Sequence, residues 1–198
     1  MVRDLVPLLS YAVLRGRCRS CLGRIAPRHW HVELAAVAVA VSALLAGTAP
    51  GRLWVDCALG WTLLCLAWID WDSMTLPDVL TLPLIGAGLL ATLGFDHGVL
   101  TDHAVAAAFG YTAFQGLAII YRSLRGKDGL GQGDAKLLAA LGAWVGLEGL
   151  PGVVLGAALT GLAAALLLSL SGRKMSPSTA IPFGPCLALA GWVARLQS

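Results

Sequence analysis

The sequence predicts an all-α protein, a polytopic bundle of membrane-spanning helices. Of its 198 residues, 58% are hydrophobic and only 13% are charged, and the mean hydropathy is +0.78. A soluble domain averages about 45–50% apolar and about 25% charged residues. The apolar residues also gather into long runs separated by short polar links, which is typical of a chain that crosses a membrane several times.

We expect about seven spans, the fifth of them short. The apolar runs cover residues 32–49, 53–69, 79–95, 103–121, 136–147, 151–170 and 181–196. The fifth run is short for a ~20-residue span, so we expect that helix to be half-buried among its neighbours. The chain thus divides into a basic cytoplasmic segment, 1–31, which carries one Cys-x-x-Cys pair, and a transmembrane domain, 32–198.

The basic residues indicate how the chain is oriented. If the N-terminus is cytoplasmic and the runs alternate, twelve of the 14 Lys and Arg residues lie on the cytoplasmic side, and only Arg52 and Arg195 lie on the other. This split is a strong positive-inside signal. The same alternation brings Asp70 and Asp134 to the cytoplasmic boundary between water and lipid. Indole rings favour that kind of interface, and five tryptophans fall near the ends of runs: Trp30, Trp54, Trp71, Trp144 and Trp192.

The stretch from Gly131 to Asp134, Gly-Gln-Gly-Asp, places a carboxylate beside two glycines at the start of a membrane segment. Gly131 and Gly133 lack a Cβ, so they let another backbone approach. A carboxylate at a membrane segment is costly and usually functional, and the partner we predict for Asp134 is Asp70. Two carboxyl groups about 3 Å apart share one proton, so one can activate water while the other donates to a carbonyl oxygen. That is the chemistry of an aspartic protease.

Simpler interpretations of these acids are also open. An aspartate at the end of a membrane helix often serves only as a cap, and Asp78, directly after Pro77, is placed to cap free amides. Lys136 fits a lysine that reaches to the interface and sets topology. A carrier or scaffold that uses Asp70 and Asp134 as a proton relay would need the same two carboxylates without being an enzyme.

Four blocks of the sequence resemble the type IV prepilin peptidases, and in order they cover the chain almost end to end. They are Arg15 to Leu34, Ile69-Asp70 with Leu76-Pro77-Asp78, Gly131 to Asp134 with the apolar run behind it, and residues 180–192. The resemblance implies a membrane aspartic endopeptidase that removes leader peptides from type IV prepilins or type II secretion pseudopilins, at the cytoplasmic face of a bacterial inner membrane. It implies Asp70 and Asp134 as the catalytic pair, and we assign supporting roles to Asp78, Gly131, Gly133 and Lys136.

The partners that the resemblance implies are a prepilin or pseudopilin substrate and the lipid bilayer, with no nucleic acid. Proteolysis by two carboxyl groups requires no cofactor. A related protease that acts on another membrane substrate, such as a preflagellin-like protein, remains an alternative. The sequence does not predict the oligomeric state.

The N-terminal segment departs from the family pattern. Full-length members carry a further N-terminal membrane segment and two Cys-x-x-Cys pairs, which bind zinc in a domain linked to N-methylation, whereas here only Cys18 and Cys21 are found. We therefore interpret the chain as an N-terminally truncated form and do not expect the methyltransferase activity. A structural zinc needs four ligands, and one hypothesis is that His29 and His31 supply the other two. We favour the alternative, in which both histidines are interfacial residues beside Trp30.

Overall fold

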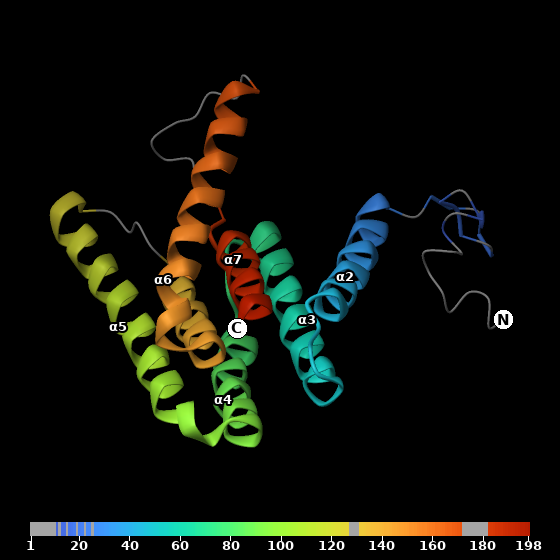
Figure 1. The fold of residues 1–198 in the computed structure, drawn as a ribbon. Helices are drawn as coiled ribbons and strands as arrows, with labels where there is room; N and C mark the ends of the chain where they lie inside the picture. The colour runs from blue at the N-terminus through green and yellow to red at the C-terminus, as the bar shows by residue number, and fades with distance from the viewer. Residues whose placement is uncertain are drawn as a thin grey trace.

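The computed structural model describes residues 26–126, 131–171 and 182–198, together with scattered positions between 11 and 24. Across these parts the chain is helical, and the only strand-like pairing is an isolated bridge between Arg17 and Arg24. The all-α prediction is therefore confirmed. Figure 1 shows the helices gathered into a bundle, from which the described positions before residue 26 stand apart.

The long helices begin and end where the local sequence dictates. They are α2 (Pro27–Leu45), α3 (Pro50–Ser73), α4 (Asp78–Phe95), α5 (Leu100–Arg125), α6 (Gln132–Leu170) and α7 (Gly184–Gln197), and a 3-10 turn, His97–Val99, precedes α5. Proline is favoured in the first helical turn, because the N–H group that it lacks would have no partner within the helix. The ends of α3 and α5 are set by Met74 and Gly126, which adopt left-handed conformations with φ of 54° and 64°.

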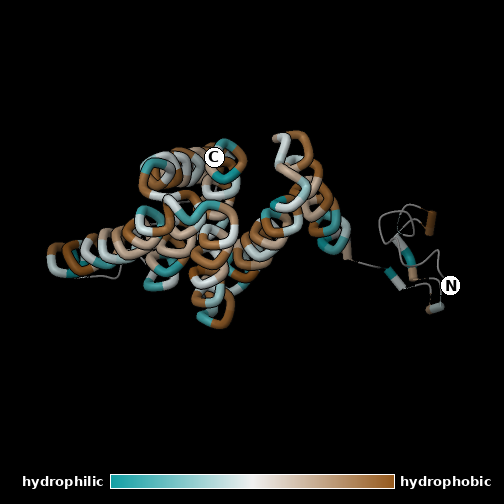
Figure 2. Tube along the Cα trace, turned by 60° about the horizontal axis from the view of Figure 1, so that its bottom comes forward, coloured by the Kyte–Doolittle hydropathy of each residue, from teal (hydrophilic) through white to brown (hydrophobic). Residues whose placement is uncertain are grey.

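Four of these helices are long and apolar enough to cross a membrane: α3, α4, α5 with its preceding turn, and α6. Figure 2 shows hydrophobic residues along most of the length of the bundle. The protein is therefore a multi-pass membrane protein. Each of the seven predicted runs coincides with a helix over most of its described length. The seventh helix, α7, has only 14 residues, so at about 21 Å it is shorter than a membrane core of about 30 Å.

Helix α6 consists of two arms that meet at Gly146. This residue has φ 71° and ψ −176°, a conformation outside the helical region that glycine adopts readily. Gly146 lies against Asp102 at the start of α5, and the carboxylate of Asp102 accepts the N–H of Leu147 at 2.9 Å. That contact satisfies one of the free amides at the start of the second arm.

The first arm, residues 132–145, and the second arm, residues 147–170, run side by side in opposite directions (Figure 1). They correspond to the fifth and sixth predicted runs. The first arm is about 21 Å long, which confirms that this helix is short. It is more deeply buried than predicted, since every residue from 137 to 145 is buried.

Helix α7 lies between α3 and α6 and packs closely against both, whereas α3 and α6 make little direct contact. Glycines allow this packing on either side. On α3, a Cβ added at Gly60 would lie 2.9 Å from the ring of Trp192. On α7, a Cβ at Gly191 would clash with the side chain of Leu141 in the first arm. The position of α3 relative to the first arm therefore depends on α7.

The interface prediction is wrong for two of the five tryptophans. Trp54 and Trp71 are exposed as expected, but Trp144 and Trp192 are buried. The indole N–H of Trp144 donates to the carbonyl of Leu84 at 2.9 Å, and that of Trp192 donates to the hydroxyl of Ser42 at 3.1 Å. A buried indole needs such a partner for its N–H, so these two rings join helices within the bundle.

Helix α5 packs directly against the first arm through two glycines. A Cβ at Gly142 would lie 2.6 Å from the carbonyl oxygen of Ala106, and one at Gly110 would lie 3.0 Å from that of Leu138. These are backbone atoms that no change of rotamer can move aside. Small residues of this kind let membrane helices pack closely.

We expect Gly142→Ala to lower the free energy of unfolding by about 1–3 kcal/mol, because the added methyl overpacks this contact. The matched control is Gly116→Ala on α5, where nothing lies within 4 Å of the added Cβ. Because alanine has the higher helix propensity, the control should be unchanged or slightly more stable. Thermal unfolding of the purified protein in detergent measures both variants, and equal stabilities would contradict the close contact.

Candidate active site

Asp70 lies one turn before the end of α3 and is buried, with 6% of its surface exposed. Its Oδ2 accepts the N–H of Gly184 at 2.9 Å. Gly184 is the first residue of α7, and the amides of a first helical turn have no partner within their own helix. The contact satisfies one such amide and fixes the position of the Asp70 carboxyl group.

The absence of a side chain at Gly184 makes this contact possible. A Cβ at this position would lie 2.7 Å from Oδ2 of Asp70 and 2.9 Å from Cγ. Sequence reasoning did not single out Gly184, although it lies within the C-terminal block that resembles the prepilin peptidases. The signal in the sequence was a helix start, Phe183-Gly184-Pro185, which supplies free amides.

Asp134 lies in the first turn of α6 and is half-buried. Its amide donates to the carbonyl of Gly131 at 3.1 Å, and a Cβ at Gly131 would lie 3.3 Å from its Oδ2. The carboxyl groups of Asp134 and Asp70 are close enough to interact electrostatically. The structure thus brings together the two acids that the sequence pairs, although their helices make little direct contact.

The predicted supporting residues surround the same end of the first arm. A Cβ at Gly133 would lie 2.8 Å from Cβ of Leu76, so this glycine lets the link between α3 and α4 lie against the start of α6. Lys136 donates to Oδ1 of Asp78 at 2.6 Å, joining the first arm to α4. More than half of the Asp78 side chain is exposed, so this ion pair contributes little stability, about 0–1 kcal/mol.

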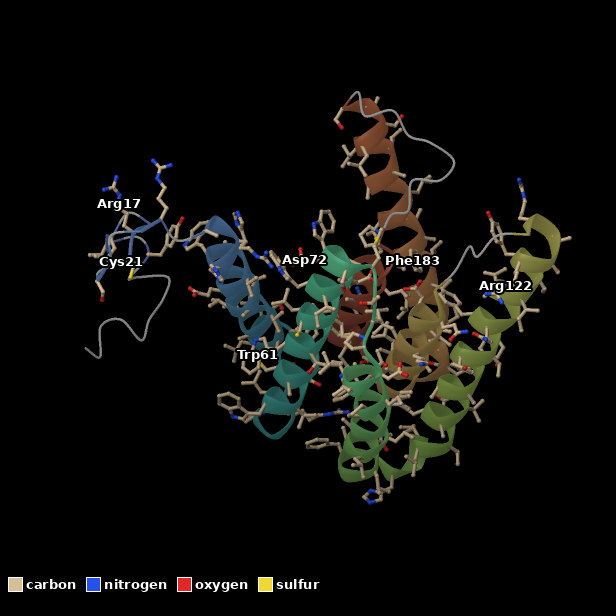
Figure 3. All side chains as sticks on the ribbon, turned by 180° about the vertical axis from the view of Figure 1, so that it is seen from behind. Arg17, Cys21, Trp61, Asp72, Arg122 and Phe183 are labelled. Atoms are coloured by element: carbon tan, nitrogen blue, oxygen red, sulfur yellow. The ribbon has the colours of Figure 1, made fainter. Side chains whose placement is uncertain are left out.

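The two acids do not lie at the outermost end of the bundle, because two neighbouring helices extend past them. Gly161 of the second arm lies against Phe183, beside the site, and from there the arm continues for about 13 Å to Leu170. The ring of Phe114 on α5 lies 6.4 Å from that of Phe183, and α5 continues for about 16 Å to Arg125. In Figure 3 Phe183 accordingly lies well below the upper ends of α5 and of the second arm of α6. The acids are therefore recessed below the ends of the two longest helices.

An open groove of about 580 Å³ lies beside the site, between α2, α3 and the start of α7. It is lined by Arg28, His31, Ala67, Trp68, Trp71, Asp72 and Pro185. At its rim, Nη2 of Arg28 donates to Oδ2 of Asp72 at 2.7 Å, and its guanidinium carbon lies 5.9 Å from the centre of the Trp68 ring. Pro185 directly follows Gly184, so the groove ends one residue away from the amide that holds Asp70.

The N-terminal thiols lie away from this site, and Figure 3 shows Cys21 apart from the bundle. The backbone N–H groups of Cys21 and Ser20 donate to the sulfur of Cys18, which lowers the pKa of that thiol. The described residues contain no group of three or more potential metal ligands. Since a structural zinc needs four, these residues do not by themselves fit a complete site, and zinc binding by Cys18, Cys21, His29 and His31 stays a prediction.

The fold and the site together define a class of protein, the multi-pass helical membrane proteins that carry a pair of aspartates at one end of the bundle. Comparison with known families identifies the chain within that class. Residues 57–166 match the type IV leader peptidase family, and residues 1–46 match the bacterial peptidase A24 N-terminal domain. The chain belongs to the type IV leader peptidase family.

Several similar proteins are described as "Prepilin leader peptidase/N-methyltransferase". The one from Aeromonas hydrophila is 46% identical over 196 residues, a match that covers 96% of this chain and 66% of the relative. That from Pseudomonas aeruginosa is 41% identical, with 96% and 66% covered, and that from Burkholderia pseudomallei is 44% identical, with 94% and 60% covered. The chain thus spans slightly less than two thirds of the length of these relatives. No solved structure matches it.

Proposed function

We propose that this protein is a membrane aspartic endopeptidase that removes leader peptides from type IV prepilins or type II secretion pseudopilins. The observation that carries the proposal is the pairing of Asp70 with Asp134, in which the amide of Gly184 holds one acid and a glycine-flanked helix start presents the other. The relatives that cover almost the whole chain are named as prepilin leader peptidases. Neither acid is engaged in an ion pair among the described residues.

The pair supplies both proton transfers that hydrolysis requires. The ionised acid takes a proton from a water molecule, whose oxygen attacks the scissile carbonyl carbon, while the protonated acid donates to the carbonyl oxygen. The tetrahedral intermediate then breaks its C–N bond, and a proton passes to the departing amine. The products are a carboxylic acid and a free amine, and the pair again holds one proton. Recession among apolar helices strengthens each electrostatic contact along this path.

The surroundings of the acids suit a peptide anchored by an apolar helix. The groove lined by Trp68, Trp71 and Pro185 offers space for an extended chain one residue away from Gly184, which holds Asp70. Gly131 leaves the space beside the carboxyl group of Asp134 open, whereas Leu76 covers Gly133. A substrate whose helix lies in the lipid would then reach the acids sideways through the bundle surface, with its leader on the side from which Asp72 and Asp78 project.

We further propose that this end of the bundle faces the cytoplasm of a bacterial inner membrane. Arg28 and Lys136 lie at this end, where they pair with Asp72 and Asp78. Arg52 and Arg195 lie at the other end, on helix turns distant from the acids. Such a distribution agrees with the positive-inside rule. Under this orientation residues 1–31 form a cytoplasmic segment and residues 32–198 the transmembrane domain.

The test is cleavage of a purified prepilin by membranes that contain this protein, with the product identified by mass spectrometry. We expect a new N-terminus at the leader junction. Membranes from the same host lacking the protein are the control. A substrate left intact by well-inserted protein would argue against the peptidase and in favour of a carrier or scaffold.

The acid pair leaves no step for a metal to perform, so we propose that proteolysis proceeds without zinc. For the N-terminal segment we keep the interpretation in which His29 and His31 are interfacial residues, since the ring of His31 packs edge-on against that of Trp30 at 5.7 Å. Cys18 and Cys21 alone then supply too few of the four ligands of a structural zinc. We expect purified protein to contain far less than one zinc per chain, and cleavage to continue in the presence of a chelator. A stoichiometric zinc that is lost in Cys18→Ser would contradict this. The matched control is Cys65→Ser, which changes an exposed cysteine on α3.

A further inference from the structure

A buried ion pair lies at the end of the bundle opposite to the two acids. Arg195 on α7 approaches Oδ1 of Asp56 on α3 with both Nε and Nη2, each at 2.9 Å. Its Nη1 donates to the carbonyl of Trp144 on the first arm at 3.3 Å, and its guanidinium carbon lies 5.8 Å from the Trp144 ring. The two charged side chains are only 10% and 7% exposed. We call Arg195, Asp56 and Trp144 the Arg195 clamp.

Each member of the clamp shares a helix with a member of the candidate active site. The pairs are Asp56 and Asp70 on α3, Arg195 and Gly184 on α7, and Trp144 and Asp134 on the first arm of α6. Along these helices the two sites are about 15–21 Å apart. Asp56 and Asp70 are separated by nearly four helical turns, so both face α7 from the same side of α3.

The clamp links α3 to the first arm of α6 across α7. Helices α3 and α6 make little direct contact, and α7 lies between them. At the upper end of α7 the amide of Gly184 holds Asp70. At its lower end Arg195 holds Asp56 and the last turn of the first arm. The spacing between Asp70 and Asp134 therefore depends on how α7 is seated at both ends.

A guanidinium is suited to this role, because its planar fork donates in several directions at once. A lysine ammonium in its place would keep the charge and lose the fixed geometry. A buried ion pair is weak evidence for stability, since its desolvation offsets most of the attraction, and a role in fixing one arrangement must be argued for the protein at hand. Here the arrangement that it fixes is the seating of the three helices that carry the site.

We propose that Arg195 and Asp56 are positioning residues, which set the geometry of the Asp70–Asp134 pair from the far end of the bundle. The inference rests on the proposed peptidase function. A misplacement of about 1 Å at reacting groups can lower a rate by about 10²-fold. Loss of the clamp should therefore lower kcat, while KM changes little because neither residue lies where the substrate binds.

The decisive variant is the double exchange Asp56→Asn/Arg195→Gln. Either single exchange leaves a buried charge without its partner, which endangers folding. The double exchange removes both charges together, and the amide of Gln can still donate to the amide oxygen of Asn. For the double variant we expect at least a tenfold lower kcat, a KM within about twofold of wild type, and an altered pH profile of cleavage. Arg195→Lys keeps the charge without the fork, so its kcat should lie between those of wild type and the double variant.

The matched control is Arg52→Gln, an exchange of the other arginine at the same end, which lies over the ring of Phe95 and outside the clamp. It should leave kcat and the pH profile unchanged. A double variant that is folded and keeps the wild-type kcat and pH profile would overturn the inference, as would a loss explained entirely by a smaller folded fraction. Wild-type protein that cleaves no prepilin would instead refute the proposed function itself.

Discussion

Exchange of either Asp70 or Asp134 for asparagine is expected to lower the rate of leader cleavage by about 10²–10⁴-fold. Asparagine keeps the size and polarity of the side chain but can neither take a proton from water nor donate one as a carboxylic acid does. In the proposed mechanism the two acids hold one proton between them, so loss of either acid also removes the proton transfer that the other depends on. Initial rates of prepilin cleavage in membranes, at matched protein levels, measure this effect.

The matched control for these exchanges is Asp96→Asn, which changes an exposed acid just after the end of α4, far from the pair. Its rate should equal that of wild type. The wild-type rate should also fall on both sides of an optimum pH, because the pair is inactive with no proton and with two. Full cleavage by either Asp70→Asn or Asp134→Asn would show that the two acids are not the catalytic pair.

The helices and the two acids were predictable because each leaves a local mark on the sequence. The helices are predicted by apolar runs that are bounded by proline, glycine and charged residues. The two glycines beside Asp134 distinguish this carboxylate from the other acids of the chain. The pairing of Asp70 with Asp134 followed from the alternation of spans, which only requires counting helices. The shortness of the fifth helix was likewise predictable, because its apolar run is itself short.

Contacts between helices were harder to predict, because the sequence does not show which side chains of different helices lie next to one another. Trp144 and Trp192 lie near the ends of runs, yet neighbouring helices cover them. In the sequence Arg195 resembles an arginine that only sets topology. Its ion pair with Asp56 could not be predicted, because Asp56 lies 139 positions away and on another helix. The recession of the acids likewise depends on how far neighbouring helices extend past them.

Gly184→Ala is expected to lower kcat by about 10–10²-fold, because the added methyl would lie 2.7 Å from Oδ2 of Asp70. The backbone of Gly184 is not in the left-handed region, so alanine can adopt its conformation and the obstacle is this contact alone. Either the carboxyl group turns away from Asp134 or the start of α7 moves outward. Both responses misplace a reacting group, and a displacement of about 1 Å is enough for such a loss.

The control is Gly86→Ala on α4, where no atom lies within 4 Å of the added methyl and where alanine favours the helix. It should retain wild-type kcat and stability. A loss confined to Gly184→Ala, in protein that is inserted and folded, would show that Asp70 must be held against the amide of α7 for cleavage. Wild-type activity in Gly184→Ala would mean that the reacting position of Asp70 differs from the one held by this amide. The acid pair would then have to form through a movement of α3 or α7 when substrate binds.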